Sequence, residues 1–218
     1  INNLPIICHV VKKAKETGIG KVIVATEDKE IVNAVEKNNG EAILTRNHKT
    51  GTDRIFEAFQ KLKITDTEYV VNLQGDEPMI DPIDIINLNN LMIKNNSDVG
   101  TLAAEIKEDS MLNNENIVKV ITKEKLEDNK FTKALTFSRK NLSKQNSNIY
   151  HHIGIYAYKV SILEKFINLN QTKNEVENHL EQLRALENNI TIMVALAKSS
   201  PIGIDTKEDY IAIKKIME

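Results

Sequence analysis

The stretch KVIVATEDKEIVNAVEKNNGEAILT, residues 21–45, decides the fold. It opens on the β-branched run KVIVAT (21–26), which is typical of a strand covered on both faces. A helical spacing of apolar residues follows over 28–38, and after Gly40 comes a second short strand, EAILT (41–45). Helix and strand therefore alternate here with short connections between them.

The same alternation extends outward in both directions. We expect helices at 5–17, 52–62 and 82–95, and strands at 68–74 and 99–106. Such a pattern predicts an α/β fold, with a mixed, mostly parallel sheet and helices on both faces. In folds of this kind ligands bind beyond the carboxyl ends of the strands.

The middle of the chain has a different pattern. Residues 117–122, 133–138 and 149–160 are β-rich with little helix between them, so we expect added, partly antiparallel strands carrying a sugar-binding or dimer surface. Alternation then returns, with helices expected at 161–168, at 176–188 and from 207, and a strand at 189–197. No repeat or linker divides the chain, which predicts a single domain over residues 1–218.

Charge and composition exclude several classes of protein. The 218 residues carry 29 basic and 31 acidic side chains, and a net charge of -2 gives no general field for nucleic acid or an anionic membrane. No apolar run approaches the ~18 residues of a membrane span and no secretory signal is visible, so we expect a cytoplasmic protein. Cys8, the single cysteine, is expected to be a buried free thiol.

The first candidate for chemistry is LQGDEP (73–78), which follows a predicted strand. An acidic residue at the carboxyl end of a strand is well placed to hold Mg²⁺, which takes few protein carboxylates and several phosphate oxygens. Asp76 is that residue. Alternatively, Gly75 and Asp76 only form a turn, in which the carboxylate accepts from nearby backbone amides.

A second candidate is IGIDTKEDY (202–210). Thr206 and Asp209 have the spacing of a capping box, which would leave Asp205 available for another role; alternatively, Asp205 is itself the cap. Asp76 and Asp205 both follow predicted strands. Two carboxylates at neighbouring strand ends could share a magnesium ion that bridges nucleotide phosphates.

Three further segments are polar and patterned. TRNHKTGTDR (45–54) opens onto a helix at about Thr52, where free backbone N–H groups suit an anion, or it is an ordinary loop with an N-cap. YHHIGIYAY (150–158) alternates, with His152 on its polar face, and suits either a hydroxyl-rich ligand or a subunit interface. In ENHLEQLRALENN (177–189) Glu181 and Gln182 could lean into a cleft, or could form a solvated face on which Glu181 pairs with Arg184.

Taken together, these segments resemble the 3-deoxy-manno-octulosonate (Kdo) cytidylyltransferases, the CMP-Kdo synthetase family. The resemblance runs through most of the chain in order. It is carried by VIVATEDKEIVNAV, LTRNHKTGTDRI, VVNLQGDEPMI, NIVKVI, LTFSRKN, YHHIGIYAY, LEQLRALEN and IGIDTKED. Each motif alone is weak, but the ordered set is specific.

The resemblance implies a Rossmann-like nucleotide-diphospho-sugar transferase fold and a homodimer. It implies that Asp76 and Asp205 bind magnesium, and that Thr52 and Arg54 line the nucleotide side together with Gln74. Around the sugar it implies Gln74, Arg139, His152, Glu181 and Gln182. The implied reaction is attack by the anomeric hydroxyl of Kdo on the α-phosphorus of CTP, for lipopolysaccharide synthesis. Positioning and electrostatics would supply most of the catalysis, with no covalent enzyme nucleophile.

The chain departs from the family pattern in two places. Members begin with a strand and a phosphate-binding loop of the form IPAR-x-x-S-x-R-x-P-x-K, whereas INNLPIICHV corresponds to the stretch after that loop. The usual glutamate four residues ahead of Leu180–Glu181 is also out of register, and we expect Glu177 to replace it.

Two rival functions fit the same residues. A sister enzyme would activate sialic acid or another sugar acid with CTP and keep the fold and the metal aspartates. A catalytically silent homologue would bind nucleotide or sugar without turnover, because of the absent phosphate loop. His152 and the LEQLR segment favour Kdo over the first rival.

Overall fold

The computed structural model describes residues 1–141, 148–200, 203–204 and 206–218. They form two compact units. Unit 1 consists of Ile1–Thr67, Asn72–Ile86 and Pro201–Glu218, and unit 2 consists of Glu68–Val71 and Asn87–Ser200. Neither unit is a continuous stretch of chain, and the expected single domain over residues 1–218 stays a prediction.

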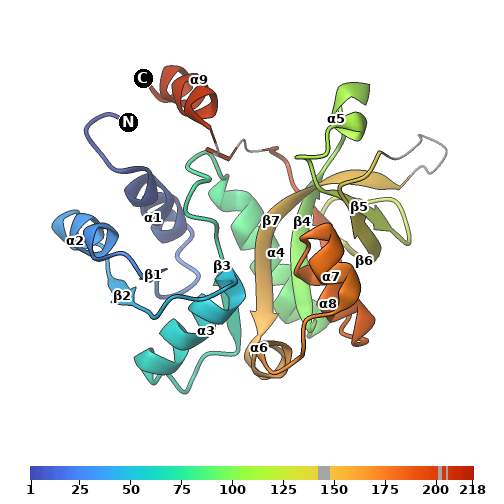
Figure 1. Cartoon of the computed structure of the whole chain (residues 1–218), viewed down its shortest axis with the longest axis horizontal. Helices are drawn as coiled ribbons and strands as arrows, with labels where there is room; N and C mark the ends of the chain where they lie inside the picture. Colours follow the sequence, from blue (N-terminus) through green and yellow to red (C-terminus); the bar gives the residue numbers. More distant parts are fainter. Residues whose placement is uncertain (142–147, 201–202, 205) are drawn as a thin grey trace. The chain divides into compact units, whose positions relative to one another are not determined.

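Unit 1 contains residues 21–45, in which strand and helix alternate. Its elements are α1 (Ile6–Glu16), β1 (Val24–Thr26), α2 (Lys29–Lys37), β2 (Ala42–Leu44), α3 (Gly51–Leu62) and α9 (Lys207–Met217). The strands β1 and β2 pair in parallel, as the strand–helix–strand pattern predicts, although both are shorter than expected (Figure 1). Helix α2 connects them, and the Asp28 side chain caps its first turn by accepting from the Glu30 N–H.

A small core joins the two helices of this motif to its strands. Cys8 and Val11 of α1 pack with Val24 of β1 and Val35 of α2. These residues are the apolar positions of the helical and β-branched patterns in the sequence. Each helix packs on the strands because it buries its apolar face there. The Cys8 thiol is buried and free, as predicted, and burial raises its pKa.

Unit 2 is built on a mixed sheet with strand order β3-β7-β4-β8-β6-β5. The strands are β3 (Tyr69–Asn72), β4 (Val99–Ala104), β5 (Lys119–Thr122), β6 (Phe131–Ser138), β7 (Ile149–Lys159) and β8 (Ile192–Leu196). β4 pairs in parallel with β8, whereas its pair with β7 and the pairs that β6 forms with β5 and β8 are antiparallel. The α/β class with a mixed sheet is confirmed. The expectation of a mostly parallel sheet is wrong for unit 2, because antiparallel pairs outnumber the parallel pair of β4 and β8 among these pairings.

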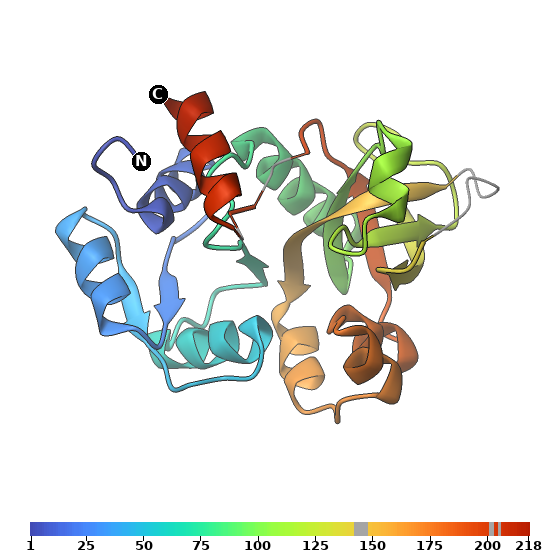
Figure 2. The same cartoon turned by 45° about the horizontal axis from the view of Figure 1, so that its top comes forward.

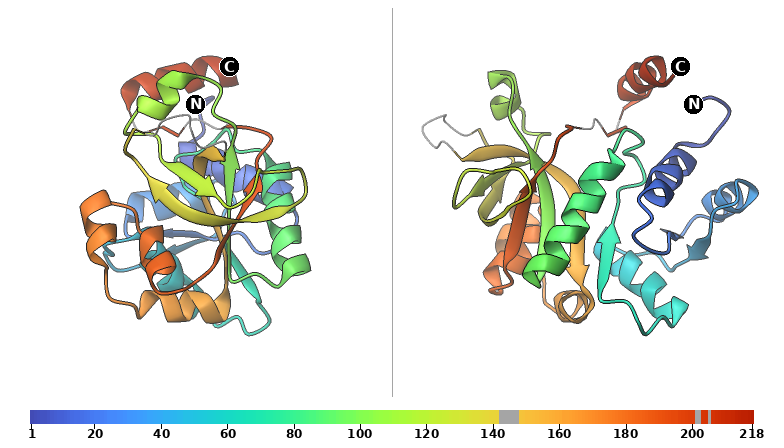
Figure 3. Two further views of the ribbon diagram at one scale, coloured as in Figure 1. Left: turned by 90° about the vertical axis from the view of Figure 1, so that its right-hand side faces the viewer. Right: turned by 180° about the vertical axis from the view of Figure 1, so that it is seen from behind.

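The long strand β7 curls this sheet. Its first residues pair with β5 and the residues that follow pair with β4. Strand β7 therefore contacts both its neighbour β4 and the strand at the far end of the order, β5 (Figure 2). Helix α4 (Pro82–Asn95) lies beside β4, every residue of which is buried (Figure 3). Gly100 of β4 permits this packing, because a Cβ there would lie 2.5 Å from the Met92 sulfur.

The other helices of unit 2 are α5 (Asp109–Asn113), α6 (Val160–Ile167), α7 (Lys173–Asn178) and α8 (Gln182–Glu187). The prediction of one helix over 176–188 is wrong, because α7 ends at His179, whose φ of 51° is left-handed (Figure 1). The short helix α5 was not expected from the sequence. No helix in the described part of the chain has both the length and the apolar character needed to cross a membrane.

Candidate active site

The loop after β3 carries the first acidic candidate in unit 1. It is a chain of turns, in which the Glu77 N–H donates to the Gln74 carbonyl at 3.5 Å and the Ile80 N–H to the Glu77 carbonyl at 3.3 Å. Gly75 passes close to α1, since a Cβ there would lie 3.0 Å from Cδ1 of Ile7. Gln74 is exposed and Asp76 is half-buried.

The segment before α9 runs beside this loop. The Ile204 N–H donates to the Asp76 carbonyl at 3.0 Å, although the two residues are far apart in the sequence. Asp205 itself lies outside the described residues. The predicted capping box is confirmed, because the Thr206 hydroxyl accepts from the Asp209 N–H while the Asp209 carboxylate accepts from the Thr206 N–H. Thr206 is therefore the N-cap of α9.

These residues fit a magnesium ion by the chemistry of their donors. Magnesium takes one or two carboxylates and completes its octahedron with water and phosphate oxygens. The Asp76 loop lies directly against the chain at Ile204, which precedes Asp205 in the sequence. Within the described ranges no group of three or more His, Cys, Asp or Glu side chains forms a metal cage, and a site of this type needs none.

The start of α3 forms the third part of the unit 1 site. The N-cap is Thr50, two residues before the expected start, and its hydroxyl accepts from the Asp53 N–H at 3.2 Å. Thr52 is buried with 2% of its surface exposed. The Arg54 guanidinium donates to the Glu27 carboxylate at 2.7 Å, and its buried Nε has no hydrogen-bond partner among the described residues.

His152 is the centre of the candidate sugar side in unit 2. It is buried, and its Nε2 lies 2.9 Å from the Thr101 hydroxyl, which itself donates to the Ile155 carbonyl at 2.7 Å. Because that hydroxyl has one hydrogen, the His152 Nε2 must carry the proton and donate. Burial lowers the pKa of His152 to about 3, helped by nearby His151 and Arg139, so the ring is neutral.

The polar face of β7 is an aromatic row. The ring centroids of His152 and Tyr156 are 5.3 Å apart, and those of Tyr156 and Tyr158 are 5.7 Å apart. The pairing with β4 shifts between Thr101 and Leu102, which face Tyr156 and Ile153. Two extra residues on β7 preserve the phase of the alternation, so the predicted face survives this bulge.

Tyr156 is a candidate that the sequence analysis did not single out. Its hydroxyl is buried and has no hydrogen-bond partner within the described ranges. Burial raises its pKa, and the nearby Tyr158 and Glu181 act in the same direction. An unsatisfied buried hydroxyl calls for an explanation, and here a bound polar ligand would supply the partner. The alternation of residues 150–158 already placed Tyr156 on the face of His152, but only the structure identifies its unpaired hydroxyl.

Glu181 and Gln182 begin α8, directly after the break that ends α7. Arg184 donates to Glu181 at 3.5 Å and forms a bidentate pair with Glu175. The alternative of a solvated charge row is wrong for Arg184, which is 3% exposed and lies 4.7 Å over the Phe166 ring. The buried glutamate of this segment is Glu175, whereas Glu177 is exposed and pairs with Lys173, and the expected role of Glu177 stays a prediction.

Arg139 follows β6 and is half-buried. Its guanidinium donates to the Asn116 carbonyl at 3.2 Å, while its own carbonyl accepts from the fully buried Lys119 ammonium at 3.0 Å. Unit 2 thus brings His152, Tyr156 and Glu181 together, with the Arg139 charge acting on His152. Thr52, Arg54, Gln74 and Asp76 belong to unit 1.

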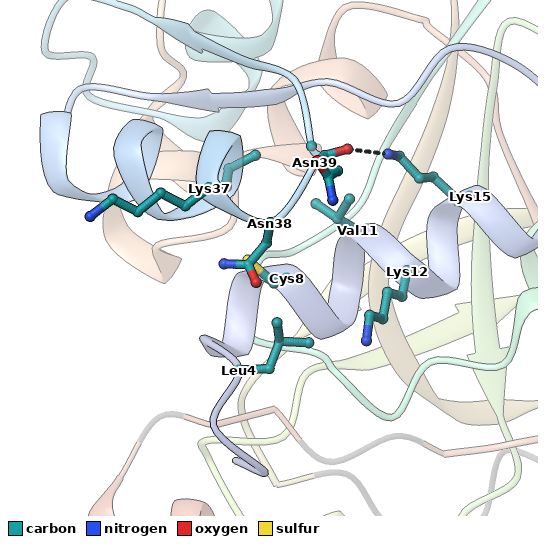
Figure 4. A pocket seen from close by; sticks show the side chains of 10 residues that line it. Leu4, Cys8, Val11, Lys12, Lys15, Lys37, Asn38 and Asn39 are labelled. Carbon is teal, nitrogen blue, oxygen red and sulfur yellow. Dashed lines mark hydrogen bonds between the residues drawn. The ribbon is translucent and has the colours of Figure 1, made fainter.

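A separate cavity of about 270 Å³ lies between α1 and α2 in unit 1 and contains none of the predicted site residues (Figure 4). Cys8 and Val11 are among its apolar lining residues, and Lys15 closes one side by donating to the Asn39 carbonyl at 2.7 Å. Lys37 points away from Cys8. This cavity adds nothing to the candidate site.

Known proteins resemble this chain over its whole length. A family model described as cytidylyltransferase matches residues 1–192. The 3-deoxy-manno-octulosonate cytidylyltransferase of Bartonella bacilliformis is 40% identical over 220 residues, which cover 100% of this chain and 89% of the relative. The enzyme of the same name from Thermodesulfovibrio yellowstonii is 42% identical over 235 residues, with coverage of 100% and 89%.

Solved structures agree with these relatives. A CMP:2-keto-3-deoxy-manno-octonic acid synthetase complexed with CTP superposes with a TM-score of 0.87 at 32% identity, covering 98% of this chain and 87% of that one. An apo UDP-glucose pyrophosphorylase superposes with a TM-score of 0.68 at 15% identity, covering 98% and 86%. The second similarity shows the fold alone.

Proposed function

We propose that this chain, which belongs to the 3-deoxy-manno-octulosonate cytidylyltransferase family, transfers CMP from CTP to Kdo. The products are CMP-Kdo and pyrophosphate, and the activated sugar serves lipopolysaccharide biosynthesis. Similarity along the whole chain at about 40% identity carries this conclusion together with the superposition on a CTP-bound synthetase. The enzyme is a nucleotidyltransferase with the Rossmann-like fold of its relatives.

The reaction is one displacement at phosphorus. The anomeric oxygen of Kdo forms a bond to the α-phosphorus of CTP, the bond from that phosphorus to the bridging oxygen of the β-phosphate breaks, and pyrophosphate leaves with the bonding pair. The proton of the anomeric hydroxyl passes to solvent. Holding the two substrates in line supplies much of the rate enhancement, because a bimolecular step becomes effectively unimolecular.

Asp76 and Asp205 are proposed to hold magnesium. When bound, the ion would neutralise charge on the triphosphate and orient the attacking oxygen. The single structural observation in support is the hydrogen bond from the Ile204 N–H to the Asp76 carbonyl, which joins the two loops that carry these aspartates. Thr52, Arg54 and Gln74 are proposed to line the nucleotide side.

The sugar side is proposed to consist of Gln74, Arg139, His152, Glu181 and Gln182. A neutral His152 and the unpaired Tyr156 hydroxyl are both suited to hydrogen-bond sugar hydroxyls without a charge penalty. The Arg139 guanidinium would attract the carboxylate of the sugar acid. Glu181, held by Arg184, would accept from sugar hydroxyls.

A homodimer and a cytoplasmic location complete the proposal. The homodimer derives from the resemblance to the family, and the cytoplasmic location is the expectation from the sequence. Light scattering of the purified enzyme at micromolar concentration would report the mass of two chains if the first statement is correct. A monomeric mass across the same concentrations would contradict it.

Pyrophosphate release tests the function directly. The full-length enzyme is incubated with CTP and Mg²⁺, with Kdo or with sialic acid as the acceptor. We expect release with Kdo, little with sialic acid, and none after chelation of the metal. Faster release with sialic acid would favour the sister enzyme, and CTP binding without release on either sugar would favour a silent homologue.

A further inference from the structure

A buried carboxylate in unit 1 binds the loop that leads into α3. Glu57 of α3 has 8% of its surface exposed. Both of its oxygens accept from the backbone N–H of Arg46 at 3.3 Å, one accepts from the Lys61 ammonium at 2.7 Å, and one contacts the His48 ring. No predicted function of the sequence uses this residue.

Burying a carboxylate is costly unless donors replace its water. Here the donors are present, and hydrogen bonds from Lys61 and His48 lower the pKa of Glu57 to about 2. The anion is therefore the form in which the loop is held at any ordinary pH. The Arg46 side chain is 82% exposed and adds little, so its backbone N–H and the His48 ring are the effective contacts.

The bound segment is the irregular loop from Thr45 to Thr50, between β2 and α3. Its first residue is tied to β1 by the Thr45 N–H, which donates to the Thr26 carbonyl at 2.8 Å. Its last residue caps α3. Between these ends, Glu57 holds the residues at 46 and 48, so a carboxylate of the helix fixes the loop that precedes the same helix.

We propose that Glu57 is a positioning residue for the nucleotide: it holds the loop Thr45–Thr50 so that the first turn of α3, with Thr52 and Arg54, is shaped to bind CTP before CTP arrives. This inference rests on the proposed function, which assigns CTP to that turn. A preorganised loop binds its ligand more tightly, because no free energy is needed to order the loop when the ligand binds.

Glu57→Gln tests the proposal, because the amide keeps the shape and loses the charge that holds His48 and Lys61. We expect the KM for CTP to rise roughly ten-fold, which is what loss of a charged hydrogen bond gives. The kcat and the KM for Kdo should change less than about three-fold, on the view that Glu57 acts only on nucleotide binding. A purely structural role would lower the amount of folded enzyme and leave the KM for CTP unchanged.

Three other variants make the test selective. His48→Ala removes the ring contact on the loop and should raise the KM for CTP by a smaller factor; it decides the question if Glu57→Gln does not fold. Lys61→Met removes a partner of Glu57 that lies on α3 and not on the loop, so the KM for CTP should stay unchanged. Glu41→Gln breaks the exposed ion pair with Lys21 in the same unit and is the matched control.

The outcomes separate this inference from the proposed function. Absence of pyrophosphate release by the unmodified enzyme with Kdo would overturn the function. An active enzyme whose folded Glu57→Gln and His48→Ala variants keep the original KM for CTP would overturn the inference alone. An equal rise in the KM for both substrates would also overturn it.

Discussion

At the scale of single residues, two tyrosines of β7 make a matched pair. The Tyr156 hydroxyl is buried without a partner in the described structure, whereas the Tyr150 hydroxyl accepts from the Leu126 N–H at 3.0 Å. Tyr156→Phe should leave the free energy of unfolding within about 0.5 kcal/mol, because no hydrogen bond is lost, while Tyr150→Phe should lower it by about 1 kcal/mol.

The effects of the two substitutions on activity should be the reverse of their effects on stability. Tyr156→Phe should raise the KM for Kdo roughly ten-fold, and Tyr150→Phe should leave it unchanged. Denaturant unfolding and steady-state kinetics on both variants check this. A destabilised Tyr156→Phe with a normal KM would mean that the hydroxyl has a structural role.

Asp76 gives the second prediction at this scale. Asp76→Asn keeps the size of the side chain and removes the charge proposed to bind magnesium, so kcat/KM should fall on the order of 100-fold or more. The melting temperature without ligands should change little. Asp66→Asn, at an exposed loop position of the same unit, is the control. Near-normal turnover in Asp76→Asn would remove this residue from the metal site.

The lowered pKa of Glu57 leads to a prediction of how the free energy of unfolding depends on pH. Its pKa is about 2 in the folded chain, held down by Lys61, His48 and Arg46, and about 4.5 in the unfolded one. The ionised Glu57 carboxylate therefore stabilises the folded chain, and this contribution is complete above the pKa of the unfolded chain. It is lost as the pH falls from about 4.5 through about 2. In Glu57→Gln the decline over this window should be shallower. Urea unfolding at a series of pH values measures it, and parallel curves would contradict the assignment.

At the scale of elements, the helices α7 and α8 depend on one buried ion pair. Arg184 and Glu175 are each about 4% exposed at the side chain, and Glu175 also completes the capping box of α7 with Thr172. Arg184→Met would leave the carboxylate buried without its cation, so the fold should lose about 3–5 kcal/mol. Adding Glu175→Gln should restore part of that loss, because glutamine still serves the capping box.

The control for this prediction is the neighbouring exposed pair. Lys173→Met breaks the contact with Glu177, whose side chains are 86% and 57% exposed, and should change stability by less than about 1 kcal/mol. Thermal or denaturant unfolding measures all three variants. If Arg184→Met were as stable as the unmodified chain, the buried pair would not be what holds α7 to α8.

The elements also show where local signals suffice. The bounds of α1, α2, α3, α4 and α9 lie within two residues of those expected, because caps and apolar stripes are local properties. The break between α7 and α8 was missed because leucine spacing continues through it. A left-handed His179 has no strong sequence signal, and after this break Arg184 of α8 reaches back to Glu175 of α7.

At the scale of the whole molecule, the division into two units makes a prediction about unfolding. Neither unit is a continuous stretch, and the chain passes back and forth between them, so neither core can form without segments that interrupt the other. We therefore expect a single cooperative transition. Far-UV circular dichroism follows the whole chain. The near-UV signal comes mainly from tyrosines, since there is no tryptophan, and all of these except Tyr210 lie in unit 2. Separate midpoints would show that the units unfold independently.

The sequence by itself determined the α/β class, the cap of α9, the buried thiol and the family, because each depends on patterns that neighbouring residues or an ordered set of motifs carry. Only the tertiary structure decided which distant residues meet. It brought Ile204 to Asp76, Glu57 to Arg46 and His48, and Glu175 rather than Glu177 to Arg184. Such choices depend on which side chains share a buried site, where each polar group must find a partner, and the linear order of residues does not specify that.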